Sequence, residues 1–97
     1  IRAAFPGGSI TGCPKIRAMR ILSDLEPWAR GPYTGSIGWI DSGGDGCLNI
    51  AIRTLVRRGE RLVLNVGGGI VADSDPAGEF EETLHKARAF LDLAGPF

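Results

Sequence analysis

The chain has 97 residues, which is the size of one small domain with a single modest core. Its 11 basic and 11 acidic side chains cancel, so no net charge would draw it to nucleic acid or to an anionic membrane. With 43% hydrophobic and 23% charged residues it is typical of a globular protein, and no apolar run reaches the ~20 residues of a membrane-spanning helix. Cys13 and Cys47 lack the spacing of a zinc site, and we expect both to be buried in a cytoplasmic protein.

The first third of the chain predicts a glycine-rich loop and one helix. The loop covers residues 5–12, and Pro14 is expected at the first position of the helix, where its missing N–H costs nothing. Apolar residues then recur at helical spacing until Pro27 ends the helix. Ile1 is not a start methionine, and residues 1–4 lack the long apolar region of a signal peptide, so we expect the sequence to be a segment of a longer protein.

Three strands are predicted next, followed by a second helix. The strands are expected over 33–41, 48–57 and 62–66, joined by a glycine-rich hairpin connection and a tight turn. The helix should begin near Pro76, after Ser74 or Asp75 as N-cap, and run to about Ala94. The predicted fold class is therefore α+β, an antiparallel three-stranded sheet with flanking helices.

The last helix carries a cluster of charged side chains beside its apolar stripe. Phe80, Leu84, Ala87, Leu91 and Ala94 form the stripe that we expect in the core. Glu79, Glu82 and Lys86 share an arc that borders it, and two carboxylates one turn apart suit a Mg²⁺ ion. The alternative is an ordinary surface ion pair between Glu82 and Lys86.

Two other features could bind an anion. Arg53 is predicted in mid-strand among apolar residues, where its planar fork could grip a carboxylate, or where it could simply face solvent. The glycine clusters at 7–12 and 67–69 could cradle an anion with backbone N–H groups or form tight turns, and neither matches a known phosphate-binding spacing. The single histidine, His85, falls on the solvent face of the last helix, so the sequence assigns no catalytic residue with confidence.

Five strings taken together resemble the C-terminal part of the chorismate-utilising enzymes, and the resemblance covers essentially residues 1–97. These strings are FPGGSITGCPKIRAM at 5–19, YTGSIG at 33–38, IAIRT at 50–54, GGGIVADS at 67–74, and Glu79-x-x-Glu82-x-x-x-Lys86. The resemblance implies that the chain is an incomplete segment of a layered α/β/β/α chorismate-binding fold.

The resemblance also assigns roles to individual residues. It implies that Glu82, with Glu79 beside it, binds Mg²⁺, and that Lys86 approaches the ring carboxylate of chorismate. It implies that Arg53 and Tyr33 receive the enolpyruvyl carboxylate. The remaining substrate-lining positions that it assigns are Ser9, Ile52 and Gly69.

Within the family, the string PGGSITG is most similar to that of the aminodeoxychorismate synthases. This likeness implies conversion of chorismate and ammonia to 4-amino-4-deoxychorismate, for p-aminobenzoate and folate, with a glutamine amidotransferase partner supplying the ammonia. Anthranilate synthase component I is the alternative within the family, and a non-catalytic anion-binding α+β module is the alternative outside it. The family's other metal-ligand pair, its acid–base histidine and the lysine of a PIKGT string lie upstream, so we expect this segment alone to be inactive and to self-associate.

Overall fold

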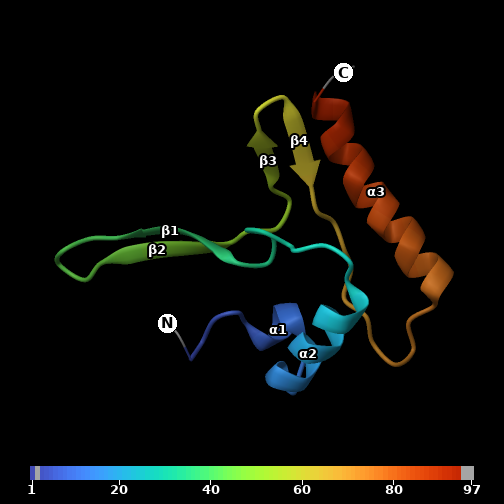
Figure 1. Cartoon of the computed structure of the whole chain (residues 1–97), viewed down its shortest axis with the longest axis horizontal. Coiled ribbons are helices and arrows are strands. Elements are labelled where there is room, and N and C mark those ends of the chain that lie inside the picture. The colour runs from blue at the N-terminus through green and yellow to red at the C-terminus, as the bar shows by residue number, and fades with distance from the viewer. Residues whose placement is uncertain (2, 95–97) are drawn as a thin grey trace. The chain divides into compact units, whose positions relative to one another are not determined.

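The structure, a computed structural model, describes residue 1 and residues 3–94, and these residues form helices and antiparallel hairpins (Figure 1). The elements are α1 (Gly8–Thr11), α2 (Lys15–Leu25), β1 (Ser36–Ile40), β2 (Gly46–Ile50), β3 (Leu55–Arg58), β4 (Arg61–Leu64) and α3 (Pro76–Ala94). The chain divides into two compact units, Ile1–Ile52 and the residues from Arg53 onward, and each is described by itself. The α+β class predicted from the sequence is confirmed.

The two main helices begin and end close to where the sequence predicts. Pro14 is the N-cap of α2 and not its first residue, and Glu26 is the C-cap, directly before Pro27. Asp75 caps α3, because its Oδ2 accepts a hydrogen bond from the N–H of Gly78 at 2.8 Å. The predicted loop at 5–12 contains the single helical turn α1, in which Thr11 Oγ1 donates to Gly7 O at 3.1 Å.

Residues 1–52 contain the hairpin β1–β2, drawn in green in Figure 1. Asp41 closes its connection by accepting hydrogen bonds from the N–H groups of Gly43 and Asp45, both at 2.9 Å on Oδ1. Gly38 faces Leu48 in the register, and a Cβ at Gly38 would lie 1.9 Å from Cys47 O. Only glycine therefore allows the two backbones to approach this closely.

The expected three-stranded sheet is wrong, since the structure has two separate two-stranded sheets, β1–β2 and β3–β4. The predicted strand 48–57 breaks after β2, where the N–H of Ile52 bonds back to Ile50 O at 2.8 Å in a three-residue turn. Arg53 follows with a φ of 50°, a left-handed conformation that ends an extended strand. Alternating residues predicted one strand, and this local turn divides it.

The described residues have very little core. Ala51 is the one residue among them that is fully buried, with 0% of its surface exposed. The expectation that Cys13 and Cys47 are buried is wrong, because both are exposed. In the predicted core stripe of α3, Phe80 is 61% and Leu91 55% exposed, Leu84 and Ala87 are half-buried, and the side chain of Ala94 lies outside the described residues. Among the described helices, none is both long and apolar enough to cross a bilayer.

Candidate functional site

The approach to α3 is built around the hydroxyl of Ser74. Its Oγ accepts a hydrogen bond from the N–H of Val71 at 3.0 Å and donates one to Glu79 Oε1 at 2.8 Å. The same hydroxyl therefore shapes the loop that precedes the helix and orients a carboxylate on the first turns of the helix. The sequence suggested Ser74 only as an N-cap, a role that Asp75 takes.

The glycine segment 67–69 lies along the side of α3 that carries the charged arc. Lys86 Nζ donates to Gly67 O at 3.3 Å, across 19 positions of the chain. Glu79 Oε2 is so close to Gly68 that a Cβ there would lie 2.8 Å from it. Glycine thus lets the backbone approach the carboxylate, and the predicted arc of Glu79, Glu82 and Lys86 has a second wall made of main chain.

Charge within this cluster is partly balanced by one ion pair. Lys86 Nζ lies 2.5 Å from Glu82 Oε1, and the hydrogen bond from Lys86 lowers the pKa of the Glu82 carboxyl below its usual 4.5. The side chain of Glu82 is 57% exposed and that of Lys86 34% exposed, so a ligand in solvent can reach both. The surface ion pair weighed from the sequence is therefore present.

Glu79 and Glu82 are of the donor type that Mg²⁺ prefers, but they do not make a complete metal site by themselves. Within the described part of the chain, no group of three or more His, Cys, Asp or Glu side chains could hold a metal by itself. Glu79 has one oxygen engaged by Ser74 and the other directed at Gly68, and Glu82 is exposed one turn along α3. Mg²⁺ commonly takes one or two protein carboxylates and fills its octahedron with water and substrate oxygens.

Among residues 1–52, backbone hydrogen bonds bring Tyr33 and Ile52 near one another. The N–H of Thr34 donates to Ala51 O at 2.9 Å, and the N–H of Ala51 donates to Gly35 O at 3.0 Å. Tyr33 directly precedes Thr34, and Ile52 directly follows Ala51. Each of these two predicted substrate-lining residues is therefore next to a member of the bonded pair. Tyr33 is half-buried in the turn over 31–34, whereas the side chain of Ile52 is 46% exposed.

The other predicted residues occupy exposed positions. Arg53 lies in the connection between β2 and β3 and not in mid-strand, and Gly69 has open space where a Cβ would stand. Ser9 is exposed on α1, a single turn that we do not regard as an anion cradle. The structure pairs Lys86 with Glu82 and places Lys86 and Glu79 against the same glycine segment, and it bonds the backbone next to Tyr33 to the backbone next to Ile52.

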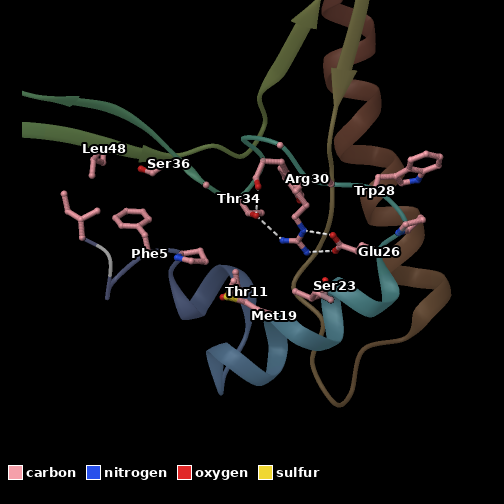
Figure 2. A pocket seen from close by; sticks show the side chains of 18 of the residues that line it. Phe5, Thr11, Met19, Ser23, Glu26, Trp28, Arg30, Thr34, Ser36 and Leu48 are labelled. Atoms are coloured by element: carbon pink, nitrogen blue, oxygen red, sulfur yellow. Dashed lines mark hydrogen bonds and ion pairs between the residues drawn. The ribbon is translucent and has the colours of Figure 1, made fainter.

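A pocket within residues 1–48 was not anticipated from the sequence (Figure 2). It has a volume of about 810 Å³, and its walls include Phe5, Met19, Leu48 and the turn that carries Tyr33. Arg30 is among the lining residues, and its Nε donates to Glu26 Oε2 at 2.7 Å and its Nη1 to Thr34 Oγ1 at 3.1 Å. The four-residue spacing of Glu26 and Arg30 is the one sequence feature that could have predicted this ion pair. That spacing is typical of pairs within a helix, whereas Arg30 lies beyond the end of α2.

The Glu26–Arg30 pair should make stability depend on pH. The hydrogen bond from Arg30 lowers the pKa of the Glu26 carboxyl below its usual 4.5, so the stabilisation is complete above that value and is lost as the pH falls through the lowered pKa. We expect Glu26→Gln to lower stability at neutral pH, modestly since the side chain is 36% exposed, and to lose this effect in acid. Urea unfolding curves from about pH 3 to about pH 7 measure this, and a difference from the parent that stays constant down to the lowest pH would contradict it.

Comparison with known proteins agrees with this arrangement of motifs. Residues 1–92 match the sequence profile of the chorismate binding enzymes. The chain belongs to this family. The resemblance of the five strings is therefore confirmed, and the α+β elements described above are a part of the chorismate-binding fold.

Relatives with two different names match the chain equally well. Anthranilate synthase component 1 1 of Haloarcula marismortui is 55% identical over 92 residues, which cover 95% of this chain and 19% of the relative. Aminodeoxychorismate synthase of Streptomyces griseus is 55% identical over 93 residues, covering 96% of this chain and 13% of the relative. Aminodeoxychorismate synthase component 1 of Klebsiella aerogenes is 50% identical over 91 residues, covering 94% of this chain and 20% of the relative.

The chain thus spans only about a fifth or less of the length of the relatives that it matches. Both synthase names occur at 55% identity, so overall similarity favours neither product.

Proposed function

We propose that this chain is the C-terminal segment of an aminodeoxychorismate synthase component I and supplies one wall of its chorismate site. The observation that carries the proposal is the cluster of Glu79, Glu82 and Lys86 against the glycine segment 67–69. Chorismate is a dianion with a flat ring, so it needs cationic partners and close backbone approach, and this cluster offers an ammonium group, carboxylates for a metal and glycine main chain. The family match over residues 1–92 supports the same substrate.

Each side chain has a distinct task in this proposal. Glu82 and Glu79 would hold Mg²⁺, which when bound supplies positive charge for the ring carboxylate of chorismate. Lys86 donates to the same carboxylate after leaving its pair with Glu82. Arg53 and Tyr33 bind the enolpyruvyl carboxylate, the first through a two-pronged guanidinium contact and the second through its hydroxyl.

The reaction proposed for the longer synthase replaces the C4 hydroxyl of chorismate by ammonia, releasing water and forming 4-amino-4-deoxychorismate for p-aminobenzoate and folate. A glutamine amidotransferase partner in the cytoplasm would supply the ammonia. The string PGGSITG, whose Ser9 is exposed and would line the substrate with Ile52 and Gly69, supports the aminodeoxychorismate product.

Anthranilate synthase component I is the second candidate, because a relative of that name is also 55% identical. The test is to incubate the longer synthase with chorismate, ammonium and Mg²⁺ and to identify the product by mass spectrometry. We expect 4-amino-4-deoxychorismate. Anthranilate as product would establish the second candidate. Unaltered chorismate would contradict both enzymatic functions and favour the non-catalytic anion-binding module.

Arg53→Lys should raise the KM for chorismate by about tenfold or more, because lysine keeps the charge but loses the two-pronged contact with a carboxylate. Both residues bear a Cβ, so the strain of the 50° φ at Arg53 is the same in parent and variant. Steady-state kinetics are the measurement. The matched control is Arg57→Lys on strand β3, where the exposed Arg57 donates through Nε to Gly59 O, two residues away, at 2.9 Å. An unchanged KM in Arg53→Lys would make Arg53 a structural residue.

A further inference from the structure

The end of helix α2 is joined to the Tyr33 turn by the side chain of Arg30. Two guanidinium nitrogens meet both oxygens of Glu26, at 2.7 Å and 2.5 Å, and a third contacts Thr34 Oγ1 at 3.1 Å (Figure 2). The guanidinium carbon also lies 5.7 Å from the centre of the Tyr33 ring. One side chain therefore contacts the helix end, the tyrosine ring and the residue that follows the tyrosine.

The position of Glu26 at the C-terminal end of α2 explains why it is paired with a cation. Glu26 is the C-cap of α2, where the negative end of the helix dipole disfavours a carboxylate. Arg30 compensates that charge with a two-pronged contact, and the pair is partly buried, with side chains 26% and 36% exposed. Because Glu26 already balances the charge of Arg30, this guanidinium is not set up to bind a substrate anion.

The turn that Arg30 holds is itself bonded to the end of strand β2. The N–H of Thr34 donates to the carbonyl of Ala51, the fully buried residue that directly precedes Ile52. The N–H of Tyr33 donates to Arg30 O at 3.3 Å, which closes the turn on itself. A change at Arg30 is therefore transmitted to Tyr33 through the ring contact and through the anchored Thr34.

We propose that Arg30 is a positioning residue that holds the Tyr33 turn, and thereby the Tyr33 hydroxyl, in place for the substrate carboxylate. This inference rests on the proposed function, which gives Tyr33 its role in binding chorismate. Arg30 acts through Glu26, Tyr33 and Thr34 and does not touch the substrate.

The decisive variant exchanges the two charges, Glu26→Arg with Arg30→Glu. It keeps an ion pair and puts the cation at the helix C-terminus, where the dipole favours it, so helix stability is preserved. It removes the guanidinium from the Tyr33 ring and from Thr34. Arg30→Lys is the conservative companion, because it keeps the charge and loses the fork. Arg57→Lys is again the control.

Kinetics of the longer synthase give the first readout. Arg30→Lys and the exchanged pair should each raise the KM for chorismate by about 3- to 10-fold, with kcat within about twofold and the KM for ammonium unchanged. Restoration of the parental KM by the exchanged pair would show that only the ion pair matters, and would overturn the inference.

Chymotryptic cleavage after Tyr33 gives a second readout that needs no activity. Cleavage should be faster in both Arg30 variants than in the parent and in the control, since a released turn is open to proteolysis more of the time. Equal cleavage rates would overturn the positioning role. If cleavage accelerates but the parent does not consume chorismate, the positioning of the turn holds and the proposed function fails.

Discussion

Replacing Glu82 by glutamine should nearly abolish chorismate turnover by the longer synthase at ordinary Mg²⁺ concentrations. Glu82 is exposed on α3 and is paired with Lys86, so it presents a carboxylate that a metal ion in solvent can reach. Glutamine removes the charge with almost no change in shape. Loss of a residue that only hydrogen-bonds to a metal ligand lowers metal affinity or activity by about 10- to 100-fold. Loss of a direct ligand should therefore lower turnover by ~100-fold or more.

The companion variant Glu79→Gln should have the smaller effect, because one oxygen of Glu79 is already occupied by Ser74. The matched control is Glu81→Gln, which removes the neighbouring carboxylate from the exposed side of the same helix. Initial rates are measured over a Mg²⁺ titration, and partial recovery of Glu82→Gln at high Mg²⁺ is expected. Near-normal rates at ordinary Mg²⁺ would refute the metal assignment.

The 97-residue chain by itself should be inactive and should self-associate. Apolar side chains stand open over much of its described surface, among them Trp28 at 81%, Ile70 at 72% and Trp39 at 58% exposure. The sheets β1–β2 and β3–β4 have two strands each, so every strand has a free edge that can pair with another chain. Exposed apolar patches and free edges both favour association.

Sedimentation equilibrium gives the mass, and a coupled assay with chorismate and ammonium gives the activity. Trp39→Lys places a charge on strand β1 and should shift the distribution toward the monomer. Arg57→Lys keeps the charge on β3 and should sediment like the parent. A well-folded monomer that turned over chorismate would mean that the residues assigned here are not the ones that do the chemistry.

Helix limits and the charged arc could be predicted because they depend on local chemistry. Pro27 stops α2, Asp75 caps α3, and helical periodicity alone puts Glu79, Glu82 and Lys86 on one arc. The glycine segment that lies against this arc could not be predicted, since its path depends on the contacts of Gly67 and Ser74 with residues of α3.

The break in the predicted strand and the exposure of the apolar side chains could not be predicted from the sequence. The alternation of apolar and polar residues around Arg53 is typical of a continuous strand. An arginine side chain does not predict a φ of 50°. Periodicity shows that Phe80 and Leu91 share one face of α3, but it does not show what covers that face, and in this structure both remain exposed.

Calorimetric titration of chorismate into the longer synthase, with and without Mg²⁺, tests most directly whether this segment forms a wall of a metal-dependent chorismate site. We expect saturable binding with Mg²⁺, much weaker binding without it, and a loss of that Mg²⁺ dependence in Glu82→Gln but not in Glu81→Gln. Chorismate binding that is equally tight with and without Mg²⁺, or unaffected by Glu82→Gln, would contradict this account.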